Sequence, residues 1–400
     1  MAEVIDLASD LIQRESLSPD DAGCQDIINT HLDALSFNIV DHSRNNTSNT
    51  WAEKDFGEGP TLVFAGHTDV VKPGSLEDWS MNGVRINPFD LTELDGQIYG
   101  RGVADMKGSL AAMVVATQEF LTEHKPEELR GRLAFLITSD EEADRTDGTQ
   151  VVIEELRRED QTIDYAIVGE ASSVEKVGDR IYVARRGSFH LKELVINGLV
   201  GHVAKDNGID AGEIAFRLQS HAAMTTWDDD PDPRFPGTSF KSWTIDGGFE
   251  LENMVSGRAV IRANWRNNPA SSGDSIRSLF ERIADETYDV VAKERMPNGD
   301  RFEYTWSLSG EPYATPSNSP FVKLVSSAVK EMTGLVPELS GGGGTSDGGV
   351  IAALGAHVVE LGVQGAGIHE ANEHIPVDAL EKLKDSYKKI LEKTLVTEVS

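Results

Sequence analysis

The stretch TLVFAGHTD, residues 61–69, indicates how this chain folds. Its first five residues form a short apolar run that leads through one glycine into polar residues. Two further apolar runs, 132–138 and 165–168, also lead into polar residues, and helical periodicity occupies 106–121 and 148–157. Short apolar strands that alternate with helices are typical of a parallel sheet covered by helices on both faces. We therefore predict an α/β fold with a mostly parallel sheet.

A different pattern occupies the middle of the chain. Residues 188–200 alternate between apolar and polar, as a half-exposed strand does. A helix, two strands and a second helix follow at 211–225, 239–245, 258–264 and 274–294. This order predicts an antiparallel sheet with helices on one face. Because the βα pattern returns after about residue 310, we predict one domain formed by residues 1–187 and 311–400, interrupted by a smaller α+β domain of residues 188–310.

Length, charge and cysteine content narrow the class of protein. The chain has 400 residues, which suggests two domains, and a formal net charge of −30, which argues against a nucleic-acid or anionic-membrane partner. No segment is long and apolar enough to span a bilayer, and the N-terminus does not resemble a signal peptide. Cys24 is the only cysteine, which excludes an intrachain disulfide and a cysteine-built zinc site. We expect a cytoplasmic protein.

His67 and Asp69 follow the first apolar run. On an extended segment these two side chains point to the same side, because the side chains of a strand alternate. The pair could chelate one metal ion, or the aspartate could orient the histidine. A turn histidine beside a capping aspartate is the alternative that carries no function.

Further ligand types for a hard or borderline cation lie at other predicted segment ends. Asp105 precedes a helix, where it could be an N-cap or a carboxylate that bridges two metals. Glu141 and Glu142 belong to an acidic run after a strand, which could be a solvated face or an active-site loop. Glu170 ends a third strand, and His369 adds a second imidazole. Two histidines with several carboxylates suit a two-zinc site with a bridging water.

Eight stretches, in the same order along the chain, resemble the M20 metallopeptidase/deacylase family. They are GHTDVVKPG (66–74), YGRGVADMKGSLAAMVVA (99–116), AFLITSDEEADRTDGT (134–149), DYAIVGEASS (164–173), RRGSF (185–189), NGLVGHVA (197–204), GGGTSDGG (342–349) and GIHEANE (367–373). The resemblance implies a zinc-peptidase-like catalytic domain with an inserted lid and dimerisation domain. It covers most of the catalytic part and is looser in the insert.

The resemblance also implies a set of metal ligands. His67 and Glu170 would bind one zinc, Glu142 and His369 would bind the other, and Asp105 would bridge both. The implied cofactors are two Zn²⁺ ions, with Co²⁺ as a candidate substitute.

Three catalytic roles follow from the same resemblance. Asp69 would orient His67, and Glu141 would be the general base, a role that suits a carboxylate not tied to a metal. His202 matches a lid histidine that completes the family's active site from the partner subunit, so a homodimer is implied. The sequence alone favours an ordinary loop histidine at position 202.

Within the family, the chain is most similar to enzymes that act on a succinylated amino acid. The implied reaction is metal-dependent hydrolysis of N-succinyl-LL-2,6-diaminopimelate to succinate and LL-2,6-diaminopimelate, a step of diaminopimelate and lysine biosynthesis. The substrate is small and anionic, so Arg185, Asn253, Arg266 and the glycine loop with Gly344 and Thr345 are candidate substrate contacts. The glycine loop could also be a flexible connector, and Arg185 could merely form a surface ion pair.

Two other functions remain open at this stage. The first is another amidohydrolase of the M20 family, such as an N-acetylornithine deacetylase, an aminoacylase or a dipeptidase. The second is a non-catalytic binding module on the same fold, against which the complete set of ligands and base argues.

Overall fold

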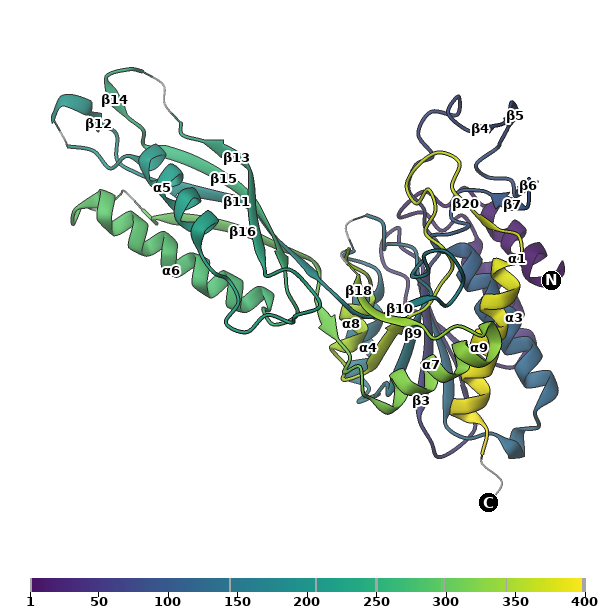
Figure 1. Ribbon diagram of the computed structural model, residues 1–400. Helices are drawn as coiled ribbons and strands as arrows, with labels where there is room; N and C mark the ends of the chain where they lie inside the picture. Colours follow the sequence, from purple (N-terminus) through teal and green to yellow (C-terminus); the bar gives the residue numbers. More distant parts are fainter. Residues whose placement is uncertain are drawn as a thin grey trace. The chain divides into compact units, whose positions relative to one another are not determined.

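The computed structural model describes residues 2–143, 145–205, 207–248, 251–295, 297, 299–342 and 344–397. The chain divides into two compact units (Figure 1). Unit 1 consists of Met1–Ala184, Ala314–Gly342 and Ser346–Ser400, and unit 2 of Arg185–Tyr313 and Gly343–Thr345. Unit 1 carries the strands and helices on which the sequence predicts metal ligands.

A nine-stranded sheet forms the centre of unit 1, in the order β1-β2-β8-β3-β9-β19-β10-β17, with β18 paired to β10. The bounds of these strands are β1 Asn38–Asp41, β2 Asn49–Asp55, β3 Thr61–His67, β8 Arg132–Thr138, β9 Tyr165–Val168, β10 Arg180–Arg185, β17 Tyr313–Ala314, β18 Glu338–Gly342 and β19 His357–Glu360. Strand β3 pairs in parallel with β8 and β9, and β19 pairs in parallel with β9. The carboxyl ends of these four strands therefore meet at one edge of the sheet.

The predicted α/β class is confirmed, and the sheet is mixed. Strands β1, β2 and β10 run antiparallel to their neighbours, and the sequence did not predict them. The reason is visible in β2, whose sequence NTWAEKD is too polar to be recognised as an apolar run. All seven residues of β3 are buried, as expected of a central strand in a parallel sheet.

Helices cover both faces of this sheet (Figure 1). On one face α1, α3, α7 and α9 pack together, with α2 beside α3, and on the other α4 packs against α8. Their bounds are α1 Ala2–Ile12, α2 Cys24–Ala34, α3 Lys107–Glu123, α4 Thr149–Arg158, α7 Pro320–Thr333, α8 Gly348–Ala352 and α9 Ala379–Leu395. Helix α3 is buried around most of its circumference, which explains its almost uniformly apolar or small side chains.

Unit 1 also contains short strands that do not belong to the main sheet. They are β4 Ser80–Met81 with β5 Val84–Arg85, and a three-stranded sheet in the order β20-β7-β6, with β6 Thr92–Leu94, β7 Gln97–Tyr99 and β20 His374–Pro376. The pairing of β7 with β20 joins the segment before Asp105 to the segment after His369.

Unit 2 is a four-stranded antiparallel sheet with two helices. The order is β13-β15-β11-β16, with β11 Gly187–Asn197, β13 Ser239–Asp246, β15 Arg258–Asn267, β16 Phe302–Gly310, α5 Ala211–Met224 and α6 Gly273–Ala292. Aromatic side chains such as Phe189, Trp265 and Phe280 fill its own core. A small pair of strands, β12 Gly201–His202 and β14 Met254–Val255, lies apart from the main sheet.

The helices of the described residues differ in length or polarity from membrane spans. None of them combines the length and the apolar character that crossing a membrane requires.

Candidate active site

The predicted ligands come together at the carboxyl edge of the parallel strands. His67 is the last residue of β3, Glu141 and Glu142 follow β8, and Glu170 follows β9. Asp105 lies just before α3, and His369 lies in the loop between β19 and β20. The strand directions therefore explain why residues three hundred positions apart in the chain share one site.

Asp105 occupies the middle of this cluster. Its Oδ1 lies 3.1 Å from His67 Nε2, and its Oδ2 lies 3.4 Å from His369 Nε2. Glu142 Oε1 is 2.8 Å from the same atom of His369, and Glu170 Oε1 is 3.8 Å from His67 Nε2. One carboxylate thus faces two imidazoles, each of which has a second carboxylate beside it.

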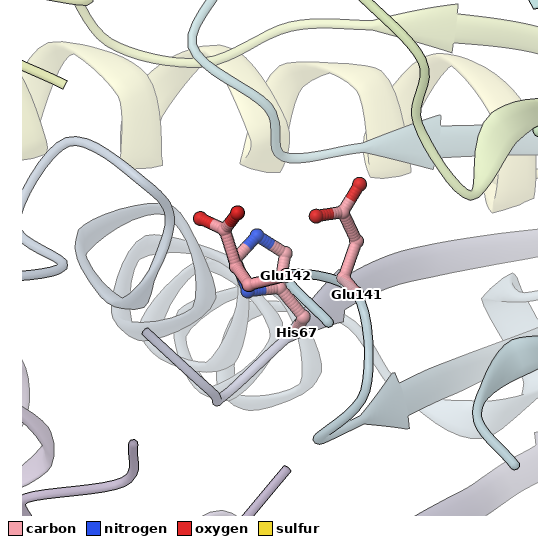
Figure 2. Close-up of side chains that lie close together, drawn as sticks. All are labelled: His67, Glu141 and Glu142. Carbon is pink, nitrogen blue, oxygen red and sulfur yellow. The ribbon is translucent and has the colours of Figure 1, made fainter. Parts of the chain in front are cut away.

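The atoms fall into groups that could each hold a metal ion. His67, Asp105 and Glu170 form one group, and Asp105, Glu142 and His369 form another, with the ligand atoms of each within 4.8 Å of one another. A third group combines His67, Glu141 and Glu142. Figure 2 shows the His67 ring between the carboxylates of Glu141 and Glu142. Imidazole nitrogens and carboxylate oxygens, without any thiolate, fit zinc or a similar borderline cation.

Two glycines allow three ligands to approach closely. A Cβ atom on Gly66 would lie 2.3 Å from Met106 Cε, and one on Gly169 would lie 2.5 Å from the same atom. These glycines precede His67 and Glu170, and Met106 follows Asp105. The Met106 methyl group therefore occupies the space that a Cβ atom at either glycine would need.

Asp69 contacts His67 through its main chain. His67 Nδ1 is 2.9 Å from the Asp69 carbonyl oxygen and 3.6 Å from its carboxylate. The carboxylate accepts hydrogen bonds from the main-chain N–H groups of Glu141 and Glu142, at 3.3 and 3.1 Å. Asp69 thus fixes the imidazole with its carbonyl group and the two glutamates with its side chain.

Arg145 is a site residue that the sequence did not predict. Its guanidinium donates to the main-chain carbonyl of Glu141 and to Glu141 Oε1. Burial raises the pKa of Glu141 well above its usual range, while Arg145 counteracts the rise.

The contacts of the two histidines favour their protonated forms. Burial alone would lower the pKa of His67, but hydrogen bonding to Asp105 and the charges of nearby carboxylates raise it well above its ordinary value. Hydrogen bonds to Asp105 and Glu142 raise the pKa of His369 to about 10. The same contacts outweigh burial and hold the pKa of Asp105 below its usual range. Protons therefore take the place that a cation would take, and a cation must displace them.

This arrangement predicts the pH dependence of stability of the metal-free protein. The pKa of His369 is about 10 when folded and about 6.5 when unfolded, so its stabilisation is complete below about pH 6.5 and is lost as pH rises through about 10. With chelator present, we expect the thermal midpoint to fall across this window less steeply in His369→Gln than in the parent protein. Equal slopes in the two proteins would contradict the assignment.

Two predicted residues of unit 2, His202 and Asn253, lie close to each other. Both residues are exposed. His202 in β12 pairs with Met254 in β14, and just beyond this pair the Val203 N–H donates to the Asn253 carbonyl. The Ala204 N–H donates to His202 Nδ1 at 3.1 Å. The neutral ring therefore carries its proton on Nε2, which leaves that atom as a hydrogen-bond donor.

The other predicted substrate contacts also belong to unit 2. Arg185 is nearly buried at the end of β10, and its Nη1 would lie 3.5 Å from a Cβ atom on Gly344. Thr345 lies close to Gly310, where a Cβ atom on the glycine would meet its side chain. Arg266 in β15 pairs with Ser188 in β11. Gly343, which belongs to the same predicted loop, lies outside the described residues.

A mixed α/β sheet with imidazoles and carboxylates gathered at its carboxyl edge defines a class of hydrolases. The chain belongs to peptidase family M20/M25/M40, which it matches over residues 63–393.

Among its relatives is the succinyl-diaminopimelate desuccinylase of Thiobacillus denitrificans, 40% identical over 395 residues that cover 98% of this chain and 95% of the relative. The aminopeptidase PepT of Bacillus cereus shares the fold, with a TM-score of 0.73 at 23% identity and 98% of each chain covered. A dinuclear metal-binding peptidase of family M20 from Bacillus subtilis has a TM-score of 0.68 at 15% identity, covering 98% of this chain and 97% of its own.

Proposed function

We propose that this protein hydrolyses N-succinyl-LL-2,6-diaminopimelate to succinate and LL-2,6-diaminopimelate, in the biosynthesis of diaminopimelate and lysine. The observation that carries the proposal is the pair of ligand groups that share Asp105, in a chain 40% identical to a desuccinylase over almost its whole length. We further propose that the protein acts in the cytoplasm, which its single, buried cysteine supports.

The proposed cofactors are two Zn²⁺ ions, for which Co²⁺ would be a substitute. His67 and Glu170 would hold one ion, Glu142 and His369 the other, and Asp105 both. Such ions supply Lewis acidity, which lowers the pKa of a water molecule and polarises an amide carbonyl.

Glu141 would act as the general base. It is buried next to the ligands, its carboxylate is paired with Arg145, and its main-chain N–H donates to Asp69 Oδ1. In the proposed reaction it removes a proton from the attacking water, whose oxygen forms a bond to the succinyl carbonyl carbon. When the C–N bond breaks, Glu141 returns that proton to the departing amine, so that succinate and the free amino acid leave.

His202 would stabilise the oxyanion that develops during the attack. Its Nε2–H is the available donor, because Nδ1 accepts from the Ala204 N–H. We propose that it acts in the active site of the partner subunit of a homodimer and that residues 188–310 form the lid and dimerisation domain. The sequence similarity of NGLVGHVA (197–204) to the family supports this role.

Cationic and N–H-rich groups would hold the substrate carboxylates. We propose Arg185, Asn253 and Arg266 for this role, together with main-chain N–H groups of Gly344 and Thr345. Arg185 and Gly344 already lie side by side in unit 2, which supports a shared carboxylate site there.

One assay tests the proposed reaction. Purified protein loaded with Zn²⁺ or Co²⁺ would receive N-succinyl-LL-diaminopimelate and N-acetyl-L-ornithine in parallel, before and after treatment with a chelator. Succinyl cleavage that the chelator abolishes and added metal restores is the expected result. Cleavage of the acetyl substrate alone would make the protein a deacetylase, and inactivity on both substrates without bound metal would favour a binding module.

A further inference from the structure

Glu373 is a buried carboxylate that contacts the main chain around Asp105. Its Oε1 accepts hydrogen bonds from the N–H groups of Gly102, Ala104 and Asp105 at 3.1, 2.9 and 3.2 Å. Among the described residues, the Glu373 carboxylate belongs to none of the groups that could hold a metal. Three main-chain N–H groups of the loop that carries Asp105 therefore donate to this one carboxylate.

Arg101 neutralises the charge of Glu373 and also contacts the loop that carries His369. Its Nη1 lies 2.5 Å from Glu373 Oε2, and both side chains are 1% exposed. Its Nη2 donates to the carbonyl of Glu370 at 2.9 Å, next to His369. One buried ion pair thus joins the loop of Asp105 to the loop of His369.

The backbone of the His369 loop needs such support. His369 has a φ of 63° and Asn372 a φ of 61°, which are left-handed conformations that residues other than glycine rarely adopt. Such backbone persists only where the surrounding structure holds it. The Arg101 guanidinium donates to the Glu370 carbonyl and the Gly100 N–H donates to the Glu373 carbonyl, so residues 370–373 are held at both ends.

We propose that Glu373 and Arg101 are positioning residues that set the separation of Asp105 from His369, and so determine the affinity of the cation site formed by Asp105, Glu142 and His369. This inference rests on the proposed two-metal function. Two of the three ligands of that site lie on the joined loops, whereas in the other site only the shared Asp105 does, because His67 ends strand β3 and Glu170 follows β9. Losing the ion pair should therefore weaken one site more than the other.

The test is a titration of metal-free protein with Co²⁺, followed by calorimetry and by visible absorption of the bound ion. The parent protein is expected to bind two ions. In Glu373→Gln, which keeps the shape but leaves Arg101 without a counter-charge, the second ion should bind at least about tenfold more weakly, with a smaller change for the first. Arg101→Lys keeps a cation beside Glu373 but cannot also reach Glu370. This variant should therefore also weaken binding of the second ion more than binding of the first, by a smaller factor than Glu373→Gln.

Asp228→Asn is the matched control. Asp228 is a buried carboxylate of unit 2 that also holds a loop, through Thr238 and Ser271. The Asp228→Asn variant should have a lower thermal midpoint than the parent protein but the same affinity for both Co²⁺ ions. Parent-like binding of both ions by Glu373→Gln and Arg101→Lys, or equal weakening of both ions, would overturn the positioning role. A parent protein that binds no second Co²⁺ would instead overturn the proposed two-metal centre, and with it this inference.

Discussion

Replacing Glu141 with glutamine is expected to lower kcat by about 10²- to 10⁴-fold, the range that a general base contributes. Glutamine has the same shape, and its oxygen can still accept from Arg145, so the loop should keep its conformation. It cannot remove a proton from water. Turnover of N-succinyl-LL-diaminopimelate and the metal content of the same preparation would be measured together, and two bound ions are expected.

Asp140→Asn is the control for this substitution. Asp140 belongs to the same acidic run and is buried, but its carboxylate accepts a hydrogen bond from the Asp147 N–H and lies in none of the ligand groups. Activity close to that of the parent is expected. If Glu141→Gln loses metal together with activity, Glu141 is a ligand, as its grouping with His67 and Glu142 would allow. If Glu141→Gln remains fully active, another group is the base.

Replacing Asp105 with asparagine is expected to have an equally large effect, through the metals. An amide offers one neutral oxygen where the carboxylate offers two charged ones to His67 and His369. We expect at most one ion per chain to remain bound. The loss of several kcal/mol of transition-state stabilisation by the metals corresponds to a fall in kcat/KM of about 10³-fold or more.

The measurement combines metal analysis after dialysis with initial rates at saturating Zn²⁺. Asp179→Asn serves as the control, because the Asp179 carboxylate accepts main-chain N–H groups of Val174, Glu175 and Lys176 without belonging to a ligand group. It should retain two ions. Two ions bound by Asp105→Asn with parent affinity would show that Asp105 does not bridge them.

The strand ends explain how the ligand groups could be predicted. Apolar runs followed by His67, Glu142 and Glu170 are local features, and the parallel arrangement brings the ends of such runs to one edge. Asp105 and His369 follow no such run. Their residue types made them candidate ligands, and the resemblance to the family assigned them to particular metals. Their distances to the strand-end ligands, 3.1 and 2.8 Å, agree with that grouping.

Other features of the site depend on contacts that no local pattern encodes. Arg101 and Glu373 are 272 positions apart, and each alone resembles an ordinary surface charge in the sequence. Asp69 was expected to orient His67 with its carboxylate, yet the carbonyl group of Asp69 makes the closer contact. Which atom of a residue faces a neighbour depends on backbone angles that packing sets.

The antiparallel strands at the sides of the sheet were missed for a related reason. Strand β2 has an apolar content too low to stand out, and its pairing with β8 compensates for its polar sequence. Cross-strand contacts, rather than intrinsic propensity, determine whether such a segment becomes a strand.

The sequence by itself determined the α/β class, the order of helices and strands in unit 2, and the kinds of ligand, because hydrophobic periodicity and residue chemistry are local properties. The tertiary structure alone decided that Arg145 holds Glu141 and that buried Glu373 supports the loop of Asp105, and it brings Asp105 next to both His67 and His369, as the family resemblance implied. The physical reason is distance along the chain. Contacts between remote residues form only when the whole core packs, and their geometry depends on that packing.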